Sequence, residues 1–434
     1  MARRWREVKI VDIAASCRNA LVGGPFGSNL ISRDYVDRGI PVIRGQNMGG
    51  RWIEGDFAFV RLAKAESLSA NLARPYDIIF TQRGTLGQVS LVPQGQFQKY
   101  LLSQSQMKLT VDREKADPLF LYYLFRTPQQ QEYIRQHAIQ TGVPHTNLGI
   151  LRDTPLPLPP LSEQHAIAQI LGTLDDKIEL NRRMSETLET MARALFKSWF
   201  VDFDPVRAKA QGRDPGLQKP IAELFPDSFE DSELREIPKG WSFGSVDAEF
   251  DLTMGQSPPG ESYNEVGEGV PFYQGRTDFG VRFPTRRMYC TAPTRFANAG
   301  DTLISVRAPV GDINMATENC AIGRGVAAAR HKTGSRSYSH QFMRSIHEVF
   351  ARFEAEGTVF GSIGKTGFHA IPCVMPPRDL VLAFERCLSP IDDRIEVNER
   401  ESRTLVALRD TLLPKLISGE LRVKHLEPFI QEAI

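Results

Sequence analysis

Cysteine is scarce in this sequence, and long apolar runs are missing from it. The 434 residues include five scattered cysteines, none at metal-ligand spacing: Cys17, Cys290, Cys320, Cys373 and Cys387. Scattered thiols in odd number indicate free cysteines in a reducing cytoplasm. No apolar run approaches the ~18 residues of a membrane-spanning helix, and no apolar stretch follows the basic start as in a secretory signal. We therefore expect a cytoplasmic protein that makes no membrane contact.

A catalytic site is also missing. Residues 257–260 read Ser-Pro-Pro-Gly and lack the aromatic residue with which an amino-methyltransferase stacks a flipped base. Residues 361–366 resemble a phosphate-binding loop, but Val359 stands where that motif requires glycine. The eight histidines are dispersed and form no metal-binding or nucleophile-activating pair. We expect no catalysis, cofactor or metal, and we expect the basic loop at 361–366 to contact a phosphate backbone.

The charge of the chain is balanced overall but uneven along its length. The sequence has 53 Lys and Arg against 52 Asp and Glu. Residues 270–336 hold ten basic against four acidic residues, and residues 33–113 hold eleven against seven. A local basic patch, and not the total charge, is the electrostatic footprint of nucleic-acid binding. The pattern therefore favours two basic regions separated by more acidic segments.

The most informative feature of the sequence is a duplication. Residues 159–200 align with 376–417 without a gap, and the offset is fixed at 217. Asp-Asp-Lys-Ile-Glu-Leu-Asn at 175–181 thereby meets Asp-Asp-Arg-Ile-Glu-Val-Asn at 392–398. Looser matches lie upstream: 39–46 with 269–276, 77–83 with 301–307, and Trp5 with Trp241. A two-copy repeat predicts a pseudo-symmetric protein, in which the part of fixed length acts as a spacer.

Both fixed segments carry apolar residues at alternating steps of four and three, which predicts long helices with a coiled-coil seam. The first seam comprises Ile167, Leu171, Leu174, Ile178, Asn181, Ser185, Leu188, Ala192, Leu195 and Trp199. The second comprises Phe384, Leu388, Ile391, Ile395, Asn398, Ser402, Leu405, Arg409, Leu412 and Leu416. Only Arg409 interrupts the pattern, and we expect Leu408 to cover that position.

The ends of the two helices are marked in the sequence. Each helix follows a double proline, and Ser162 and Asp379 stand where an N-cap is expected. Gly419 is placed to end the second helix. Because neither seam has another partner of matching length, we expect them to pack antiparallel. Asn181 and Asn398 should then lie within one helical turn of each other and fix the register.

Several segments of the sequence resemble a known protein family. The double proline, the Asp-Asp-Lys-Ile-Glu-Leu-Asn block and the segment 196–209 (Phe-Lys-Ser-Trp-Phe-Val-Asp-Phe-Asp-Pro-Val-Arg-Ala-Lys) closely resemble the specificity subunit of type I restriction–modification systems. Residues 224–229 and 237–241 look like the approach to that family's second recognition domain. The resemblance covers essentially the whole chain. One departure is at 25–28, where Pro-Phe-Gly-Ser replaces a counterpart that reads Met-Gly-Gln-Ser-Pro-Pro at 254–259.

The resemblance implies a non-catalytic subunit that reads a bipartite, asymmetric site in double-stranded DNA. In that family the helices set the unread spacer and bind two modification subunits, which methylate adenine, and restriction subunits add the translocase and nuclease. Asp175 is adjacent to Asp176, and Asp392 to Asp393. On a helix the two side chains of each pair point about 100° apart, so they cannot act on one substrate. The resemblance makes contact with the modification subunits their expected role.

The fold class that follows is α+β, with two pseudo-symmetric α/β target recognition domains separated by two long antiparallel coiled-coil helices. The expected division of the chain is a first recognition domain, the central spacer helix, a linker, a second recognition domain, the C-terminal spacer helix and a tail. Their respective ranges are 1–160, 161–202, 203–235, 236–377, 378–419 and 420–434.

Residues able to contact DNA follow equivalent segments of the two halves. Arg recognises guanine, and Asn or Gln recognises adenine, in the major groove. In the first half the candidates are Arg44, Gln46, Asn47, Gln82, Arg83, Thr85, Thr141, His145 and Asn147. In the second half they are Gln274, Arg276, Thr277, Ser305, Arg307, Ser362, Lys365 and Thr366. Strand ends of a rigid domain are common places for such residues.

Two other functions compete with DNA recognition. A coiled-coil adaptor could bridge two protein partners without reading DNA, but the basic regions and their candidate base-reading residues argue against it. An autonomous methyltransferase or nuclease would need the catalytic site that the sequence lacks.

Overall fold

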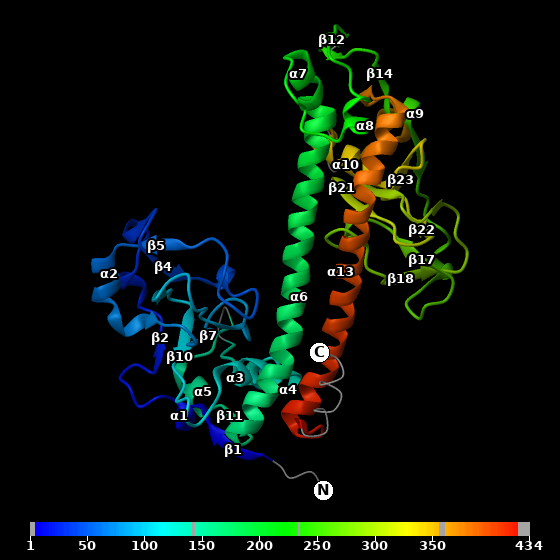
Figure 1. Cartoon of the computed structure of the whole chain (residues 1–434). Coiled ribbons are helices and arrows are strands. Elements are labelled where there is room, and N and C mark those ends of the chain that lie inside the picture. The colour runs from blue at the N-terminus through cyan, green and yellow to red at the C-terminus, as the bar shows by residue number, and fades with distance from the viewer. Residues whose placement is uncertain (1–4, 141–143, 233–234, 356–360, 424–434) are drawn as a thin grey trace. The chain divides into compact units, whose positions relative to one another are not determined.

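The computed structural model describes residues 5–140, 144–232, 235–355 and 361–423. The chain divides into two compact units, which are Met1–Leu180 together with Glu401–Ile434, and Asn181–Arg400. Two long helices, α6 (Leu161–Phe196) and α13 (Arg378–Ser418), contribute a segment to each unit (Figure 1). A π-helical segment, Lys197–Val201, continues α6. The helices thus coincide closely with the predicted spacers.

Helices α6 and α13 begin at Leu161 and Arg378, where the predicted spacer ranges begin, but the predicted N-caps are wrong. In α6, the amides of Glu163 and Gln164 donate to the Pro160 carbonyl at 2.9 and 3.0 Å. In α13, the Leu380 amide donates to the Pro377 carbonyl at 3.0 Å. The second proline of each pair therefore accepts the first helical hydrogen bonds, so Ser162 and Asp379 lie inside the first turn and are not N-caps. Gly419, with φ of +75°, ends α13 as predicted.

Within each unit the two helix segments run antiparallel. In the first unit, Asp175 pairs with Arg409 at 2.8 Å and Lys177 with Glu401 at 3.5 Å, so the residue numbers rise along one helix as they fall along the other. In the second unit, Asn181 Nδ2 donates to the Asn398 carbonyl at 3.5 Å. The predicted register is therefore confirmed.

One detail of the seam prediction is wrong. Leu408 is 45% exposed and does not cover the position of Arg409. The Arg409 side chain itself fills the seam, where only 18% of it is exposed and its guanidinium pairs with Asp175. An ion pair across the interface can occupy a position that a heptad pattern assigns to an apolar residue, because the aliphatic part of arginine packs while its charge is matched.

The first unit contains a mixed α/β domain ahead of α6. Its strands are β1 (Arg6–Lys9), β2 (Leu21–Gly23), β3 (Tyr35–Val36), β4 (Ile40–Ile43), β5 (Ala58–Val60), β6 (Leu72–Ala73), β7 (Ile78–Thr81), β8 (Val89–Leu91), β9 (Tyr100–Leu102), β10 (Gln106–Leu109) and β11 (Pro155–Leu158). Its helices are α1 (Ile10–Ile13), α2 (Leu62–Ser67), α3 (Pro118–Phe125), α4 (Pro128–His137) and α5 (Leu148–Asp153).

The second unit contains a similar domain between α6 and α13. Its strands are β14 (Ser242–Ser245), β15 (Phe250–Met254), β16 (Tyr263–Asn264), β17 (Val270–Tyr273), β18 (Met288–Cys290), β19 (Phe296–Ala297), β20 (Thr302–Val306), β21 (Val310–Met315), β22 (Cys320–Ile322), β23 (Val326–His331) and β24 (Pro372–Met375). Its helices are α9 (Val246–Glu249), α10 (Arg336–Ser345), α11 (His347–Ala355) and α12 (Lys365–His369). The linker holds α7 (Asp204–Ala210), α8 (Lys219–Ala222), and the paired strands β12 (Phe229–Glu230) and β13 (Ile237–Pro238).

The two domains have the same strand topology. The first has sheets of order β2-β10-β7-β8, β3-β5-β4-β9-β6 and β1-β11. The second has β15-β23-β20-β21, β16-β18-β17-β22-β19 and β14-β24, so each label is the first domain's label plus thirteen. Even the parallel pair of the five-stranded sheet recurs, as β4 with β9 and as β17 with β22. The duplication predicted from the sequence is therefore a duplication of the fold.

Each domain shares its core with its segment of the helix pair. In the first unit, Ile167 and Leu171 of α6 and Leu416 of α13 belong to the same buried cluster as Phe120 of α3. In the second unit, the rings of Phe196 and Phe384 lie 5.7 Å apart, and both helices share a cluster with α10. Because the apolar face of each helix is covered by a domain as well as by its partner helix, neither domain is an appendage of a free coiled coil.

The weak match between Trp5 and Trp241 is also meaningful. Trp5 precedes β1, and its Nε1 donates to the Ile417 carbonyl at 2.7 Å near the end of α13. Trp241 precedes β14 and packs against Phe200 and Phe203 just beyond the end of α6. Each tryptophan thus fixes the entry of its domain to the last turn of one long helix.

Candidate nucleic-acid interface

In the first unit, the structure brings two predicted loops together. The backbone of Arg83, which follows β7, forms an antiparallel bridge with His145 ahead of α5. The Thr146 amide also donates to the Gln82 carbonyl at 3.0 Å. Arg83 and Thr85 are exposed, whereas Gln82 and His145 are half-buried. Two segments more than fifty residues apart in sequence thereby form one polar surface.

The second unit has the equivalent arrangement. The backbone of Arg307, which follows β20, bridges to Ser362, and the Ala308 amide donates to the Gly361 carbonyl at 3.3 Å. Arg307, Ser362, Lys365 and Thr366 are all exposed, with Lys365 at the first position of α12. Exposed cationic and hydroxyl groups on paired loops suit contacts to phosphates and base edges.

The segments after β4 and β17 form matching turns. The Arg44 amide donates to Asn47 Oδ1 at 3.0 Å, and the Gln274 amide donates to Asp278 Oδ2 at 2.7 Å. In each turn a buried side chain holds the backbone, so that its neighbours face solvent. The predicted residues that are exposed here are Gln46, Gln274, Arg276 and Thr277, while Arg44 is half-buried.

Two predicted base-reading residues lie inside the fold instead, which corrects their assignment. Asn47 is 1% exposed, and its Nδ2 donates to the carbonyls of Glu54 and Asp56, both at 3.0 Å. Ser305 is fully buried, and its Oγ accepts a hydrogen bond from the Asp312 amide at 2.9 Å. Asn147 is the N-cap of α5, with its side chain accepting from the Ile150 amide at 2.9 Å. Thr141 lies outside the described residues.

The adjacent aspartates of α6 have partners within their own unit. Asp175 accepts hydrogen bonds from the Tyr123 hydroxyl at 2.7 Å and from Arg409 at 2.8 Å, and Asp176 pairs with Arg51. Burial and the nearby Asp175 carboxylate raise the pKa of the Tyr123 hydroxyl, which therefore stays a donor. These contacts fasten the first domain to the helices, although Asp176 remains 70% exposed.

The aspartates of α13 play the same structural part in the second unit. Arg282 is 2% exposed, and it pairs with Glu189 at 2.8 Å and with Asp392 at 2.5 Å. Asp393 pairs with Arg336 while keeping 64% of its side chain exposed. Because Asp392 is itself 2% exposed, its observed role is to hold the domain, and it does not form part of an open partner surface.

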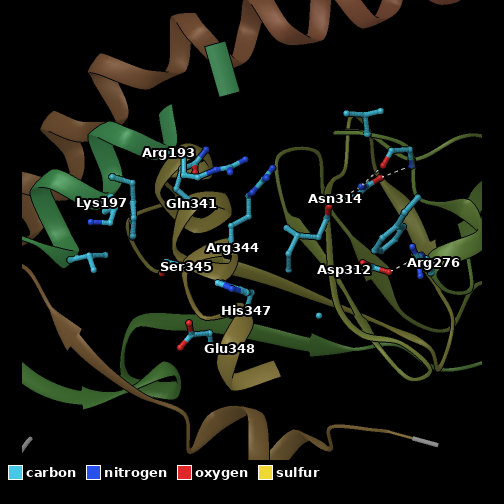
Figure 2. Close-up of a pocket in the computed structure, with 17 residues that line it drawn as sticks. Arg193, Lys197, Arg276, Asp312, Asn314, Gln341, Arg344, Ser345, His347 and Glu348 are labelled. Atoms are coloured by element: carbon cyan, nitrogen blue, oxygen red, sulfur yellow. Dashed lines mark hydrogen bonds and ion pairs between the residues drawn. The ribbon is translucent and has the colours of Figure 1, made fainter. Parts of the chain in front are cut away.

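A cleft of about 860 Å³ opens beside α6 in the second unit (Figure 2). Arg193 and Lys197 line it from the helix side, and Gln341 and Arg344 of α10 line the facing wall. Figure 2 shows Arg193, Gln341 and Arg344 gathered at one end, with Arg276 and Asp312 at the other. Arg276 pairs with Asp312 at 3.0 Å, which ties a predicted DNA-contacting residue to the rim of this cleft.

The first unit has a smaller cleft of about 290 Å³ at the equivalent place. Its wall includes Arg126, Asp410 and Pro414. The offset of 217 relates Asp410 to Arg193 and Pro414 to Lys197. Arg126 directly follows α3, and Arg344 lies near the end of the equivalent helix α10. Arg193, Gln341 and Arg344 were not among the predicted residues, although the gapless alignment shows the change of charge between Arg193 and Asp410.

The described residues give no support for a metal site or a membrane segment. Among them, no three His, Cys, Asp or Glu side chains come together as metal ligands would. None of the helices in that part of the chain combines the length and apolar character needed to cross a bilayer.

Comparison with known proteins agrees with this architecture. Residues 5–190 match the type I restriction modification DNA specificity domain. The putative type I restriction enzyme MjaX specificity subunit of Methanocaldococcus jannaschii is 30% identical over 431 residues, which cover 97% of this chain and 94% of that protein. The HindI specificity subunit of Haemophilus influenzae is 24% identical, with 74% and 81% of the two chains covered.

A solved structure supports the fold. The S subunit of a type I restriction–modification system from M. genitalium superposes with a TM-score of 0.64 and covers 95% of this chain and 96% of its own, although only 17% of the residues are identical. The duplicated domains, the paired helices and the full-length similarity to the M. jannaschii protein together identify the family of this chain. It belongs to the specificity subunits of type I restriction–modification systems.

Proposed function

We propose that this chain is a non-catalytic subunit whose two domains each read one half of a bipartite, asymmetric site in double-stranded DNA. The observation that carries the proposal is the pairing of exposed polar loops at equivalent places in both domains. Arg83 is bridged to His145 in one domain, and Arg307 is bridged to Ser362 in the other. The two loop pairs differ in sequence, so the two domains are expected to read different bases.

The helix pair has two parts in this proposal: it sets the unread gap, and it binds two modification subunits that methylate adenine. Four exposed apolar residues on the helices support the second part. Leu180 and Val397 are 53% and 47% exposed, and Met191 and Leu408 are 54% and 45% exposed. Each pair is related by the offset of 217. Exposed apolar residues at equivalent positions of the two repeats suit two copies of one partner.

Only two of the four adjacent aspartates are exposed enough for the partner contact that the resemblance implies. Asp176 and Asp393 keep enough exposure to contact a modification subunit beside their internal arginine partners. Restriction subunits would join the assembled complex and supply translocation and cleavage. We place the assembly in the cytoplasm, where its DNA substrate is available.

Methylation mapping tests the proposal directly. The genome of the host is compared with that of a strain lacking this chain, and sites that lose adenine methylation are aligned. The expected result is one asymmetric motif of two short half-sites around a fixed gap. Unchanged methylation would contradict the proposal. A complex that assembles with the modification subunit but never binds DNA would identify the chain as a protein adaptor instead.

The absence of catalysis has its own test. The purified chain, incubated with DNA and S-adenosylmethionine or with Mg²⁺, is expected to neither methylate nor cleave, and the activity should appear only with the modification and restriction subunits. Activity of the chain alone would overturn this part of the proposal.

A further inference from the structure

The cleft beside α6 in the second unit has an excess of positive charge. Four cationic residues line it, Arg193, Lys197, Arg276 and Arg344, against the two carboxylates of Asp312 and Glu348, which leaves a formal charge of 4 − 2 = +2. Several of these cations are already matched, because Arg276 pairs with Asp312 and Lys197 with Asp202. Arg193 is exposed and has no ion-pair partner among the residues that the structure describes.

The end of the cleft lined by Arg193, Gln341 and Arg344 can accommodate an anion. Arg344 is held by a single contact to Glu189 at 3.3 Å, and Glu189 is shared with Arg282. Burial, together with the positive charges of Arg193 and Arg282, lowers the pKa of the Arg344 guanidinium. Gln341 is 2% exposed, and its Nε2 is buried without a hydrogen-bond partner in the described part of the chain. A bound anion would relieve both the repulsion between guanidinium groups and the unpaired donor.

The equivalent cleft of the first unit lacks this excess charge. Arg126 and Arg409 stand there against Asp175 and Asp410, which gives 2 − 2 = 0. Arg409 pairs with both aspartates, at 2.8 and 2.7 Å. The position of Arg193 is taken by Asp410, so the charge is reversed within an otherwise gapless alignment. Two copies of one protein partner would meet a positive cleft in one unit and a neutral cleft in the other, whereas the two half-sites of an asymmetric DNA target need not be held in the same way.

We propose that the cleft lined by Arg193, Gln341 and Arg344 binds a backbone phosphate of the DNA whose half-site the second domain reads. This inference rests on the proposed DNA-reading function. A guanidinium matches the geometry of a phosphate through two parallel hydrogen bonds. The same cleft includes Arg276, whose segment follows β17, and Gly311 at the start of β21, which follows the Arg307 loop. The cleft thus extends from these three residues to the loops proposed to read bases, which favours DNA over an acidic protein segment.

The contact predicts a specific salt dependence. The chain is co-purified with its modification subunit, and the affinity for a duplex carrying the mapped target is measured across salt concentrations. Loss of one phosphate contact lowers the slope of log affinity against log salt by ~0.9, which is roughly a fivefold to tenfold loss of affinity near 0.1 M salt. Arg193→Ala should produce this change equally on target and non-target DNA, and should leave the methylated sequence unaltered.

The phosphate itself can be located. Neutral methylphosphonates are introduced one at a time along the half-site, and the loss of DNA affinity that each causes is measured. In Arg193→Ala, the methylphosphonate at one position only should no longer lower the affinity. Arg193→Lys should retain most of the slope, and Arg193→Asp, which copies the first unit, should weaken binding further. Arg213→Ala is the matched control, since Arg213 is an exposed arginine of the same unit outside the cleft, and its slope should equal that of the parent.

Each other outcome rejects the inference in a recognisable way. If the parent complex binds DNA and Arg193→Ala leaves both the slope and the methylphosphonate pattern unchanged, the phosphate site is wrong while the proposed function stands. If that variant instead loses modification subunit on purification without a change in slope, the cleft holds an acidic protein segment. A parent complex that does not bind DNA would overturn both proposals.

Discussion

Arg282 is a buried arginine that fixes the second domain to the helix pair. It is 2% exposed and contacts Glu189 of α6 and Asp392 of α13. Removal of one partner from a buried ion pair leaves an uncompensated charge, which costs about 3–5 kcal/mol. Arg282→Ala should therefore lower the free energy of unfolding of the full chain by about that amount, as measured by urea denaturation.

Two variants make the Arg282 prediction specific. Arg286→Ala removes an arginine whose side chain is 55% exposed in its pair with Glu318, and the expected loss is below ~1 kcal/mol. Combining Arg282→Met with Asp392→Leu should recover part of the stability, because no charge is then left at position 392 and Glu189 keeps Arg344 as a partner. An Arg282→Ala loss no greater than that of Arg286→Ala would contradict the assigned role.

His340 makes the second unit sensitive to acid. The ring is fully buried, and burial together with the charges of Arg282 and Arg344 holds its pKa well below the ordinary value. In the unfolded chain it takes up a proton as the pH falls below ~6.5, whereas the folded chain keeps it neutral. The unfolded state then binds more protons, so the unfolding free energy falls as pH decreases, by up to ~1.4 kcal/mol per unit from this residue.

The His340 prediction is checked by thermal unfolding of parent and variant between pH 7.5 and pH 5. In this range His340→Leu should show a shallower dependence on pH than the parent. His137→Leu, which removes an exposed histidine, should keep the parental slope. Parallel curves for the parent and His340→Leu would show that His340 does not carry the effect.

Arg307 is expected to read one half-site and Arg83 the other. Both are exposed and lie in equivalent bridged loops. Arg307→Ala should weaken or relax recognition of one half-site by ~1–3 kcal/mol while the modification subunits still assemble. Methylation mapping would detect this as new bases tolerated in that half only, with Arg83→Ala acting on the other. A parental methylation pattern in both variants would count against base reading.

The roles of individual side chains were harder to predict than the locations of the loops that carry them. Asn47 and Gln46 are neighbours with similar amide chemistry, yet only Gln46 is exposed. Which of the two is buried depends on the turn after β4, which the sequence pattern did not specify. Likewise, Asp392 looked like a surface acid until Arg282, 110 residues away in the chain, was placed beside it. Roles that depend on one distant partner could not be read from local spacing.

At the scale of elements, the helices were predictable because their signal extends over many residues. A heptad pattern and a preceding double proline indicate each helix, and Gly419 marks the end of α13. An error in the N-cap assignment does not alter how the helices pack. The polar seam residues Asn181 and Asn398 fixed the register correctly because each is buried beside the other helix. The short strands were not predicted individually, since many span only two to four residues.

The exposed apolar residues of the helices give an element-scale prediction. Leu180→Asp should remove one modification subunit, and Val397→Asp should remove the other, because a charge placed in an apolar interface must be desolvated. The mass of the purified complex should show that the number of bound modification subunits falls from two to one in each single variant and to none in the double variant. Lys219→Asp, at an exposed position of α8, is the control and should retain both copies. Two copies on the double variant would place the interface elsewhere.

At the scale of the whole molecule, the internal repeat was the sequence feature that predicted the architecture best. It anticipated two domains of one topology although residue identity between them is low outside the helices. The domains diverge in their loops and in the charge of their clefts, as Arg193 and Asp410 illustrate. A duplicated frame preserves length and packing, while the surfaces that meet a non-repeating DNA sequence are free to differ.

The last prediction concerns the length of the frame. Duplicating residues 178–184 in α6 and 395–401 in α13 adds one heptad to each helix and keeps the seam in phase. Seven residues add roughly 10 Å of helix at ~1.5 Å per residue, equivalent to about 3 base pairs at ~3.4 Å. Methylation mapping of a strain carrying this variant should find both half-sites unchanged and the gap between them longer by about three base pairs. A duplication in one helix alone should disrupt assembly, because the two seams no longer match. If the paired insertion left the gap at its original length, the helices would not be what sets it.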